Sequence, residues 1–192
     1  SGGYTTISAA LADANYGDTI RVQGGSYPGF HILKDGIKLI GENNPTIAGT
    51  LELYCLNCQI KWFTINAIET GILGDPGDFV NGNTITGNTI NAGTFGIYIP
   101  NGKGNTINAN TISANIFGIE IDSGSGNVIT GNKINSNSGG FGIGIGQADN
   151  TIYYNCVKSS GNSLSSSNTF ITASEDYYYN GRHFTSRPKG NY

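Results

Sequence analysis

The carboxylates that could perform acid–base chemistry in this chain are few and scattered. Asp78 and Asp122 each precede an Asn-Thr-Ile or Asn-Val-Ile motif by five residues. If those motifs stack, the two carboxylates lie in one column about 10 Å apart, close to the separation found in inverting glycosidases. No basic residue converges on them, so we expect no catalytic residues and no enzyme. A polysaccharide lyase, epimerase or hydrolase is the alternative.

A second set of residues could contact a glycan. Tyr98, Glu120 and Gly144 fall at equivalent places in successive repeats, where their side chains are expected to face outward. An aromatic ring beside a glycine makes a shallow surface on which a sugar ring or a neighbouring protein could stack. The alternative interpretation is that these are ordinary surface residues with no binding role. The candidate glycan contacts are Tyr98, Glu120, Asp78 and Asp122.

Metal-binding patterns are weak. The segment Asp75-Pro-Gly-Asp78 could hold Ca²⁺ through oxygen ligands, and a solvated turn is the alternative. His31 and His183 lie too many repeats apart to form a pair. The sequence contains no Met and no His-rich set that would suit copper. We therefore expect no cofactor, with Asp75 and Asp78 as weak Ca²⁺ candidates.

The three cysteines are candidates for cross-links. Cys55 and Cys58 form a C-x-x-C motif that offers too few ligands for Zn²⁺ and lacks the βαβ context of a redox motif. Cys156 lies about four coils later, roughly 19 Å away and beyond disulfide reach. It aligns with Lys133 of the preceding repeat, which places it outward and suggests a bond between subunits. A buried small residue is the alternative, and the pairing of the cysteines stays open.

The elements that position these side chains are repeats of 22 to 23 residues. Asn-Thr-Ile or Asn-Val-Ile begins at positions 83, 105, 127 and 150, and Phe-Gly-Ile-x-Ile begins at 95, 117 and 141. Each repeat is expected to hold three short strands separated by polar, glycine-rich bends. Looser matches extend the period upstream to about eight coils, a rod roughly 40 Å long.

A second Asn follows in every repeat and is predicted to lie in a bend. Its amide can donate to the Asn of one neighbouring coil and accept from the Asn of the other. Such a column satisfies buried polar groups that would otherwise cost about 1–3 kcal/mol each. We interpret these residues as structural and not as glycan attachment sites. They are Asn88, Asn110, Asn132 and Asn155.

Both ends of the chain resemble covers for open strand edges. Residues 5–15 place Ile7, Ala10 and Leu11 on one helical face, with Thr5 or Thr6 as N-cap. In the segment DYYYNGRHF, two short runs with aromatic residues flank the dipeptide Asn-Gly, which is a strong signal for a β-hairpin. We expect an all-β solenoid in a single domain, 1–192. Its N-terminal cap is 1–17, its coils are 18–170 and its C-terminal cap is 171–192.

Composition restricts the possible partners. Charged residues make up 12% of the chain and the formal net charge is −3, with no cluster of Lys or Arg. Nucleic acid and anionic membrane surfaces are therefore excluded as partners. No apolar run approaches the roughly 18 residues of a membrane span. Because the sequence has no Met and begins at Ser1, we expect a processed protein exported to the cell surface.

The segments TISAALADANYGDTIRVQGGSY and IKLIGENNPTI, with the Asn-Thr-Ile coils, resemble the β-helix repeat family that includes NosD. The resemblance covers nearly the whole chain and implies a right-handed parallel β-helix. The tail DYYYNGRHFTSRPKGNY resembles that of archaeal, especially methanogen, cell-surface members, which implies a surface layer or sheath. The same fold serves polysaccharide-processing enzymes, so it does not decide function.

Two functions remain in competition. Uncharged outer columns, capped ends and an odd cysteine favour an extracellular structural protein that self-assembles into a cell-surface layer, sheath or filament. Its partner is then another copy of itself. The alternative is a carbohydrate-binding or polysaccharide-processing β-helix whose partner is a cell-surface glycan. An ice-binding face is disfavoured, because the Thr-x-Thr ladder breaks at Asn108 and Val128.

Overall fold

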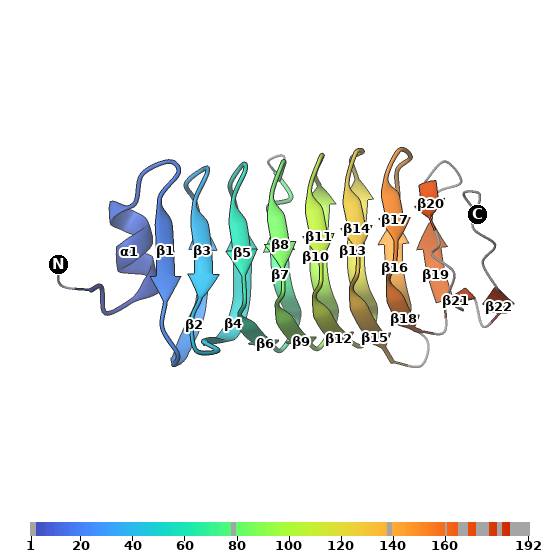
Figure 1. Cartoon of the computed structure of the whole chain (residues 1–192), viewed down its shortest axis with the longest axis horizontal. Coiled ribbons are helices and arrows are strands. Elements are labelled where there is room, and N and C mark those ends of the chain that lie inside the picture. The colour runs from blue at the N-terminus through green and yellow to red at the C-terminus, as the bar shows by residue number, and fades with distance from the viewer. Residues whose placement is uncertain are drawn as a thin grey trace.

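The chain winds into a right-handed parallel β-helix, as its repeats and the family resemblance together predict. The structure is a computed structural model that describes residues 3–77, 80–137 and 140–159 in full, and the backbone of four strands beyond them. The coils stack along one axis, with the N-terminal helix at one end and a hairpin at the other (Figure 1). Each later turn contributes three short strands, so the rod has three faces.

Face 1 is one sheet in which every strand pairs in parallel with the strand of the next coil. Its strands are β1 (Thr19–Val22), β3 (Lys38–Gly41), β5 (Gln59–Lys61), β8 (Thr84–Thr86), β11 (Thr106–Asn108), β14 (Val128–Thr130), β17 (Thr151–Tyr153) and β20 (Thr169–Ile171).

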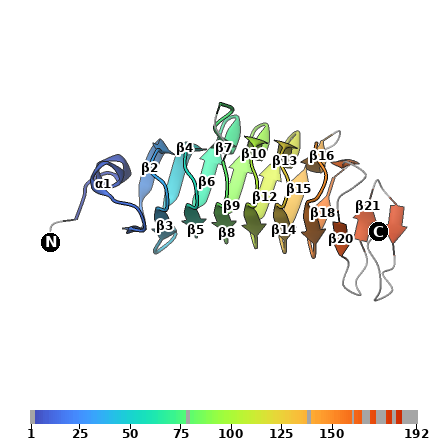
Figure 2. The same ribbon diagram turned by 90° about the horizontal axis from the view of Figure 1, so that it is seen from above.

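Faces 2 and 3 belong to a second sheet, across the core from face 1 (Figure 2). The strands of face 2 are β6 (Thr64–Ala67), β9 (Thr89–Ala92), β12 (Thr111–Ala114), β15 (Lys133–Ser136) and β18 (Cys156–Lys158). The strands of face 3 are β7 (Thr70–Gly74), β10 (Phe95–Asn101), β13 (Phe117–Ser123), β16 (Phe141–Ile145) and β19 (Gly161–Leu164).

Two early strands join faces 2 and 3. β2 (Ser26–Ile32) and β4 (Thr46–Leu53) are longer than the strands of face 2 and run across both faces. The first part of β4 pairs with β6 and its last part pairs with β7. Gly49, with φ of 142°, lies at the bend between these parts, where a side chain would be strained.

The number of complete turns is slightly lower than the expected eight. About six turns run from β1 to the end of β16. β17, β18 and β19 then extend all three faces, and β20 adds one more strand to face 1.

The core is a set of isoleucine ladders that run along the axis. Side chains point alternately inward and outward along each strand. The inward β-branched side chains stack on the equivalent side chains of the next coil. Ile60, Ile85, Ile107 and Ile129 of face 1 are all fully buried. Ile65, Ile90 and Ile112 line face 2 in the same way, and Ile72, Ile97 and Ile119 line face 3.

Two asparagine ladders run through the bends on either side of face 1. In the ladder after face 1, the side-chain oxygen of Asn110 accepts from both the backbone N–H and the amide of Asn88, at 3.0 and 3.1 Å. The Asn110 amide also donates to the Ile85 carbonyl. Asn132 and Asn155 continue the pattern. The ladder before face 1 is built in the same way by Asn83, Asn105, Asn127 and Asn150.

Both ends of the rod carry the elements that the sequence predicts. Helix α1 (Ile7–Asp13) buries Ile7, Ala10 and Leu11 against the first coil, and Thr6 is its N-cap, accepting from the Ala9 N–H. At the other end β21 (Tyr177–Tyr179) and β22 (Arg182–Phe184) form an antiparallel hairpin.

Candidate functional site

The outward columns of face 1 are uncharged from β8 to β17. The strand registers stack Thr84, Thr106, Val128 and Thr151 in one column and Thr86, Asn108, Thr130 and Tyr153 in the next, as expected from the repeat. These positions hold no acid or base. Face 1 therefore carries no candidate catalytic group in this part of the rod.

Face 3 is different, because carboxylates, phenols and an imidazole stack on its outer side. One outward column runs through His31, Glu52, Leu73, Tyr98, Glu120 and Gly144. The position two residues further along each strand forms a second column. From the coil of Glu52 onward this second column holds Tyr54, Asp75, Pro100, Asp122 and Gly146. Two side-chain clusters form on these columns.

The first cluster contains Tyr98, Glu120 and Asp122, and we call it the Tyr98 cluster. Glu120 and Asp122 lie two residues apart on β13, so both side chains point outward on the same face. The Tyr98 hydroxyl donates a hydrogen bond of 2.6 Å to Asp122 on the next coil. This hydrogen bond raises the pKa of Tyr98 to about 12, because ionisation would place a second negative charge beside Asp122.

Glu120 is half-buried over Gly144. Its Oε2 atom is shielded from solvent and has no hydrogen-bond donor. A methyl group at Gly144 would lie 2.9 Å from that atom, so the carboxyl occupies the space left by the missing side chain. Burial, followed by the neighbouring Asp122 carboxyl group and its negative charge, raises the pKa of Glu120 to about 7. Near neutral pH, Glu120 is therefore only partly ionised.

Stacked phenyl rings flank the Tyr98 cluster. Phe95, Phe117 and Phe141 occupy one outward position in three successive coils, with ring centroids 5.7 and 5.0 Å apart. The ring of Tyr98 stacks on Phe95 at 4.8 Å. These contacts fix the orientation of the phenol, because the ring is held by stacking and its hydroxyl by Asp122.

The second cluster lies near the start of face 3 and contains His31, Glu52 and Tyr54; we call it the His31 cluster. The His31 ring nitrogen Nδ1 donates to Glu52 across 3.0 Å, and the Tyr54 hydroxyl donates to the same carboxylate oxygen across 2.7 Å. The hydrogen bond to Glu52 raises the pKa of Tyr54. Glu52 and Tyr98 are two strand spacings apart, which is about 10 Å.

Several sequence-predicted residues fall elsewhere. Asp78 lies outside the described residues. The strand registers align Leu73 with Tyr98 and Tyr98 with Glu120, so the residue equivalent to Asp122 is Asp75, two residues beyond Leu73. The difference arises because extra residues are inserted between β7 and the next repeat Asn. Asp75 accepts a hydrogen bond from the Gly77 N–H, which is a local turn contact. In the fully described ranges no group of three His, Cys, Asp or Glu is placed to hold a metal ion.

The cysteines divide into a pair and a single thiol. Cys55 and Cys58 form a disulfide with a Cα to Cα distance of 6.3 Å, and both side chains are buried. Cys156 is a free cysteine with an exposed side chain. It lies opposite Lys133 in the register of β15 and β18, which confirms the predicted alignment.

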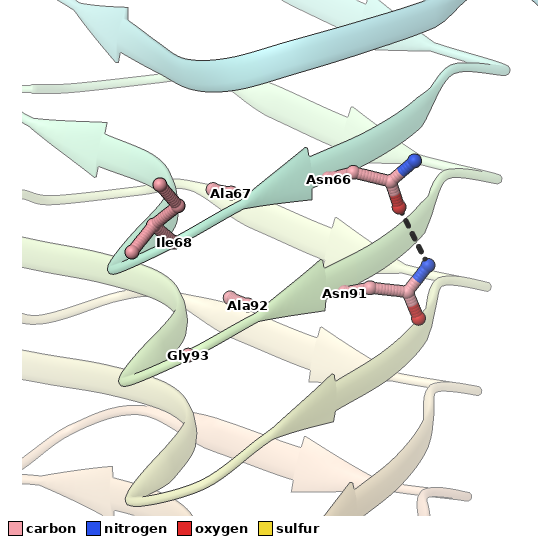
Figure 3. Close-up of a pocket in the computed structure, with 6 residues that line it drawn as sticks. All are labelled: Asn66, Ala67, Ile68, Asn91, Ala92 and Gly93. Carbon is pink, nitrogen blue, oxygen red and sulfur yellow. Dashed lines mark hydrogen bonds between the residues drawn. The ribbon is translucent and has the colours of Figure 1, made fainter.

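A shallow hollow lies on face 2, away from both clusters (Figure 3). Its lining includes Asn66 and Asn91, which are joined by a hydrogen bond of 2.9 Å, and the 93% exposed Ile68. The hollow contains no titratable side chain. Face 3 therefore remains the candidate functional surface.

The model of the family described as "Periplasmic copper-binding protein (NosD)" matches residues 29–192. The chain belongs to the NosD family. The fold of this NosD-family chain is also similar to a crystal structure of a pectin methylesterase mutant in complex with a hexasaccharide. That match has a TM-score of 0.68 and 12% sequence identity, and it covers 96% of this chain and 71% of the other. No curated protein gives a significant sequence match.

The donor set described here does not fit the copper ion in the family description. The whole sequence contains no Met, and His31 is already paired with Glu52. Cys55 and Cys58 are bonded to each other and carry no thiolate for a metal. No copper chemistry is therefore assigned to these residues.

The His31 cluster was missed by sequence reasoning, which considered His31 only as a partner for His183. The upstream repeats match loosely, so the register that brings Glu52 beside His31 was not visible. One signal was present, because His31, Glu52 and Leu73 follow each other at intervals of 21 residues.

Proposed function

We propose that this protein is a glycan-binding β-helix located outside the cytoplasm, and that face 3 binds a polysaccharide chain along the rod. The periplasmic description of its family supports the location. No helix among the described residues is long and apolar enough to cross a membrane. The pectin methylesterase structure supports the ligand class by fold analogy alone, since that protein is in complex with a hexasaccharide.

The observation that carries the proposal is the fixed phenol of Tyr98. The Phe95 ring and the Asp122 carboxylate hold Tyr98 in one orientation before any ligand arrives. A preorganised aromatic side chain loses little conformational entropy on binding, and its ring face suits the apolar face of a sugar. Carboxylate oxygens beside it can accept hydrogen bonds from sugar hydroxyls.

Binding fits the geometry better than cleavage. Glycosidases separate their two carboxyl groups by about 5 Å or more, so that substrate or water fits between them. Asp122 is instead bound by the Tyr98 hydroxyl, and Glu120 turns a shielded carboxyl oxygen toward Gly144. A polysaccharide-processing activity would need another pair of groups. We therefore propose a non-catalytic role for the Tyr98 cluster.

The test is a binding assay on immobilised neutral, anionic and amine-bearing polysaccharides, with the Tyr98→Ala variant. We expect at least one polysaccharide to bind, and its dissociation constant to rise roughly tenfold in the variant. Tyr153→Ala removes an outward tyrosine from face 1 and serves as the matched control. If no polysaccharide binds, or if both variants bind like the unmodified protein, the proposal is wrong.

A second candidate function is assembly through a cysteine. The exposed Cys156 is the odd thiol left once Cys55 and Cys58 are paired, and it lies on the outward side of face 2. Two copies joined through Cys156 would be a first step toward a cell-surface layer, sheath or filament. Neither the NosD family description nor the pectin methylesterase structure supports such a layer. Electron microscopy of oxidised protein, before and after reduction and with Cys156→Ser, distinguishes linked assemblies from single rods.

A further inference from the structure

Charges are segregated between the faces of the rod. The strands of face 3 and the two strands that lead into it, from β2 to β19, contain no Lys or Arg. The same face carries the carboxyl groups of Glu52, Asp75, Glu120 and Asp122. The described basic side chains lie on other strands or in turns: Arg21, Lys38 and Lys61 on face 1, Lys133 and Lys158 on face 2, and Lys34 and Lys103 in turns.

The carboxyl groups recur along the axis of face 3. Asp75 and Asp122 are two strand spacings apart, and Glu52 and Glu120 are three, which corresponds to about 10 and 14 Å. A linear polymer lying along the axis therefore meets a carboxyl group within every one or two coils. Among the described residues of this face, His31, which is hydrogen-bonded to Glu52, is the only side chain able to carry a positive charge.

The sign of this charge array selects the ligand. A polyuronate would bring one negative charge per sugar against the face, and like charges brought together at an interface suppress binding. A polymer with ammonium groups would gain Coulomb attraction at each carboxylate, and its sugar rings could still stack on Tyr98. A positive charge near Glu120 would also favour the ionised form of that carboxyl group.

Building on the proposed glycan-binding role, we infer that face 3 recognises a cationic polysaccharide, a polymer of amino sugars whose amines are free. The aromatic side chains provide the stacking surface, and the carboxylates provide selectivity for the ammonium groups. Neutral N-acetylated polymers bind more weakly because they lose the charge attraction, and uronate polymers are repelled.

The experiment compares three oligosaccharides of equal length on the intact protein: a glucosamine oligomer, its fully N-acetylated form and an oligogalacturonate. We expect the glucosamine oligomer to bind most tightly and the oligogalacturonate not to bind. At about 1 M salt, where the screening length falls to about 3 Å, the advantage of the glucosamine oligomer should disappear. Glu52→Gln and Asp75→Asn should each weaken its binding about two- to fivefold without affecting the acetylated form.

Two controls give the result a clear meaning. Asp149→Asn removes a carboxylate from an exposed turn outside face 3 and should leave binding unchanged. An oligolysine of equal charge should bind more weakly than the glucosamine oligomer; equal binding would show that charge alone decides and would overturn the inference. Tighter binding of the acetylated oligomer or of the oligogalacturonate would also overturn the inference, but it would leave the proposed glycan-binding function in place. If the protein binds none of the three oligosaccharides and no other polysaccharide, both the inference and the proposed glycan-binding function are wrong.

Discussion

The hydroxyl of Tyr98 on β10 donates a hydrogen bond to the carboxylate of Asp122 on β13, one coil further along the rod. This side-chain contact links two successive coils on the outer surface of face 3. Asp122 also lies two residues from Glu120 on β13, and the pKa of Glu120 is raised to about 7. Four predictions concern this cluster and the fold that holds it.

Glu120 should make the protein less stable as the pH rises through its titration. Its pKa is about 7 in the folded protein against 4.5 for an ordinary glutamate, so the folded state binds more protons between these values. The contribution is complete below pH 4.5 and is lost as the pH rises to about 7. Because the side chain is only half-buried, we expect about 1–2 kcal/mol.

Urea unfolding curves between pH 4.5 and 7.5 measure this loss. Glu120→Gln should flatten the pH dependence over that range, because it removes the titrating group and keeps the shape of the side chain. Glu69→Gln, an exposed change outside the Tyr98 cluster, should leave the slope as it is. An unaltered slope in Glu120→Gln would show that the proton is held elsewhere.

Asn110→Ala should weaken the asparagine ladder. The substitution removes the acceptor of the Asn88 N–H and amide, and it also removes the donor to Ile85. Buried groups left without partners cost about 1–3 kcal/mol each, so we expect a loss of about 3 kcal/mol in the free energy of unfolding. Asn135→Ala, an exposed position on β15, is the control and should change stability by less than about 0.5 kcal/mol.

Gly118→Ala should be far more damaging than Gly131→Ala. A methyl group at Gly118 would lie 2.2 Å from Ile134 and 2.6 Å from the Gly142 carbonyl oxygen, a distance at which the coils must separate. Gly131 has a φ of 63°, but Ala109 occupies the equivalent corner of the preceding coil with φ of 54°. We expect about 1 kcal/mol for Gly131→Ala and loss of the folded protein, or several times that cost, for Gly118→Ala. Thermal melts that rank the two variants in the opposite order would contradict the close packing of the coils.

The cysteine pairing predicts one reactive thiol in the native, oxidised protein. A thiol reagent should label Cys156 alone, and Cys156→Ser should abolish labelling. Replacing Cys55 and Cys58 by Ser should lower stability by about 2 kcal/mol, since the bond closes a short loop. Mass spectrometry of labelled peptides locates the thiols, and labelling of Cys55 or Cys58 without reductant would exclude the pair.

Much of the scaffold could be predicted from the sequence because it depends on contacts between identical positions one repeat apart. The Asn88, Asn110 and Asn132 ladder, the outward Cys156 and the α1 cap all follow from periodicity and local capping patterns. The site could be predicted only in part. Tyr98, Glu120 and Asp122 were named as surface residues, but their mutual contacts, and the whole His31 cluster, were not foreseen.

The sequence by itself determined the period, the alternation of isoleucine with polar residues and the turn residues, and therefore a stacked coil with an aliphatic interior. Only the tertiary structure decided which polar side chains meet. Insertions at the corners change the number of residues between equivalent positions of successive coils, and the backbone pairing of the strands still aligns those positions. Asp75, and not Asp78, thus takes the place equivalent to Asp122. His31 reaches Glu52 for the same reason: parallel strand pairing aligns backbone positions across the stack, whatever number of residues lies between them.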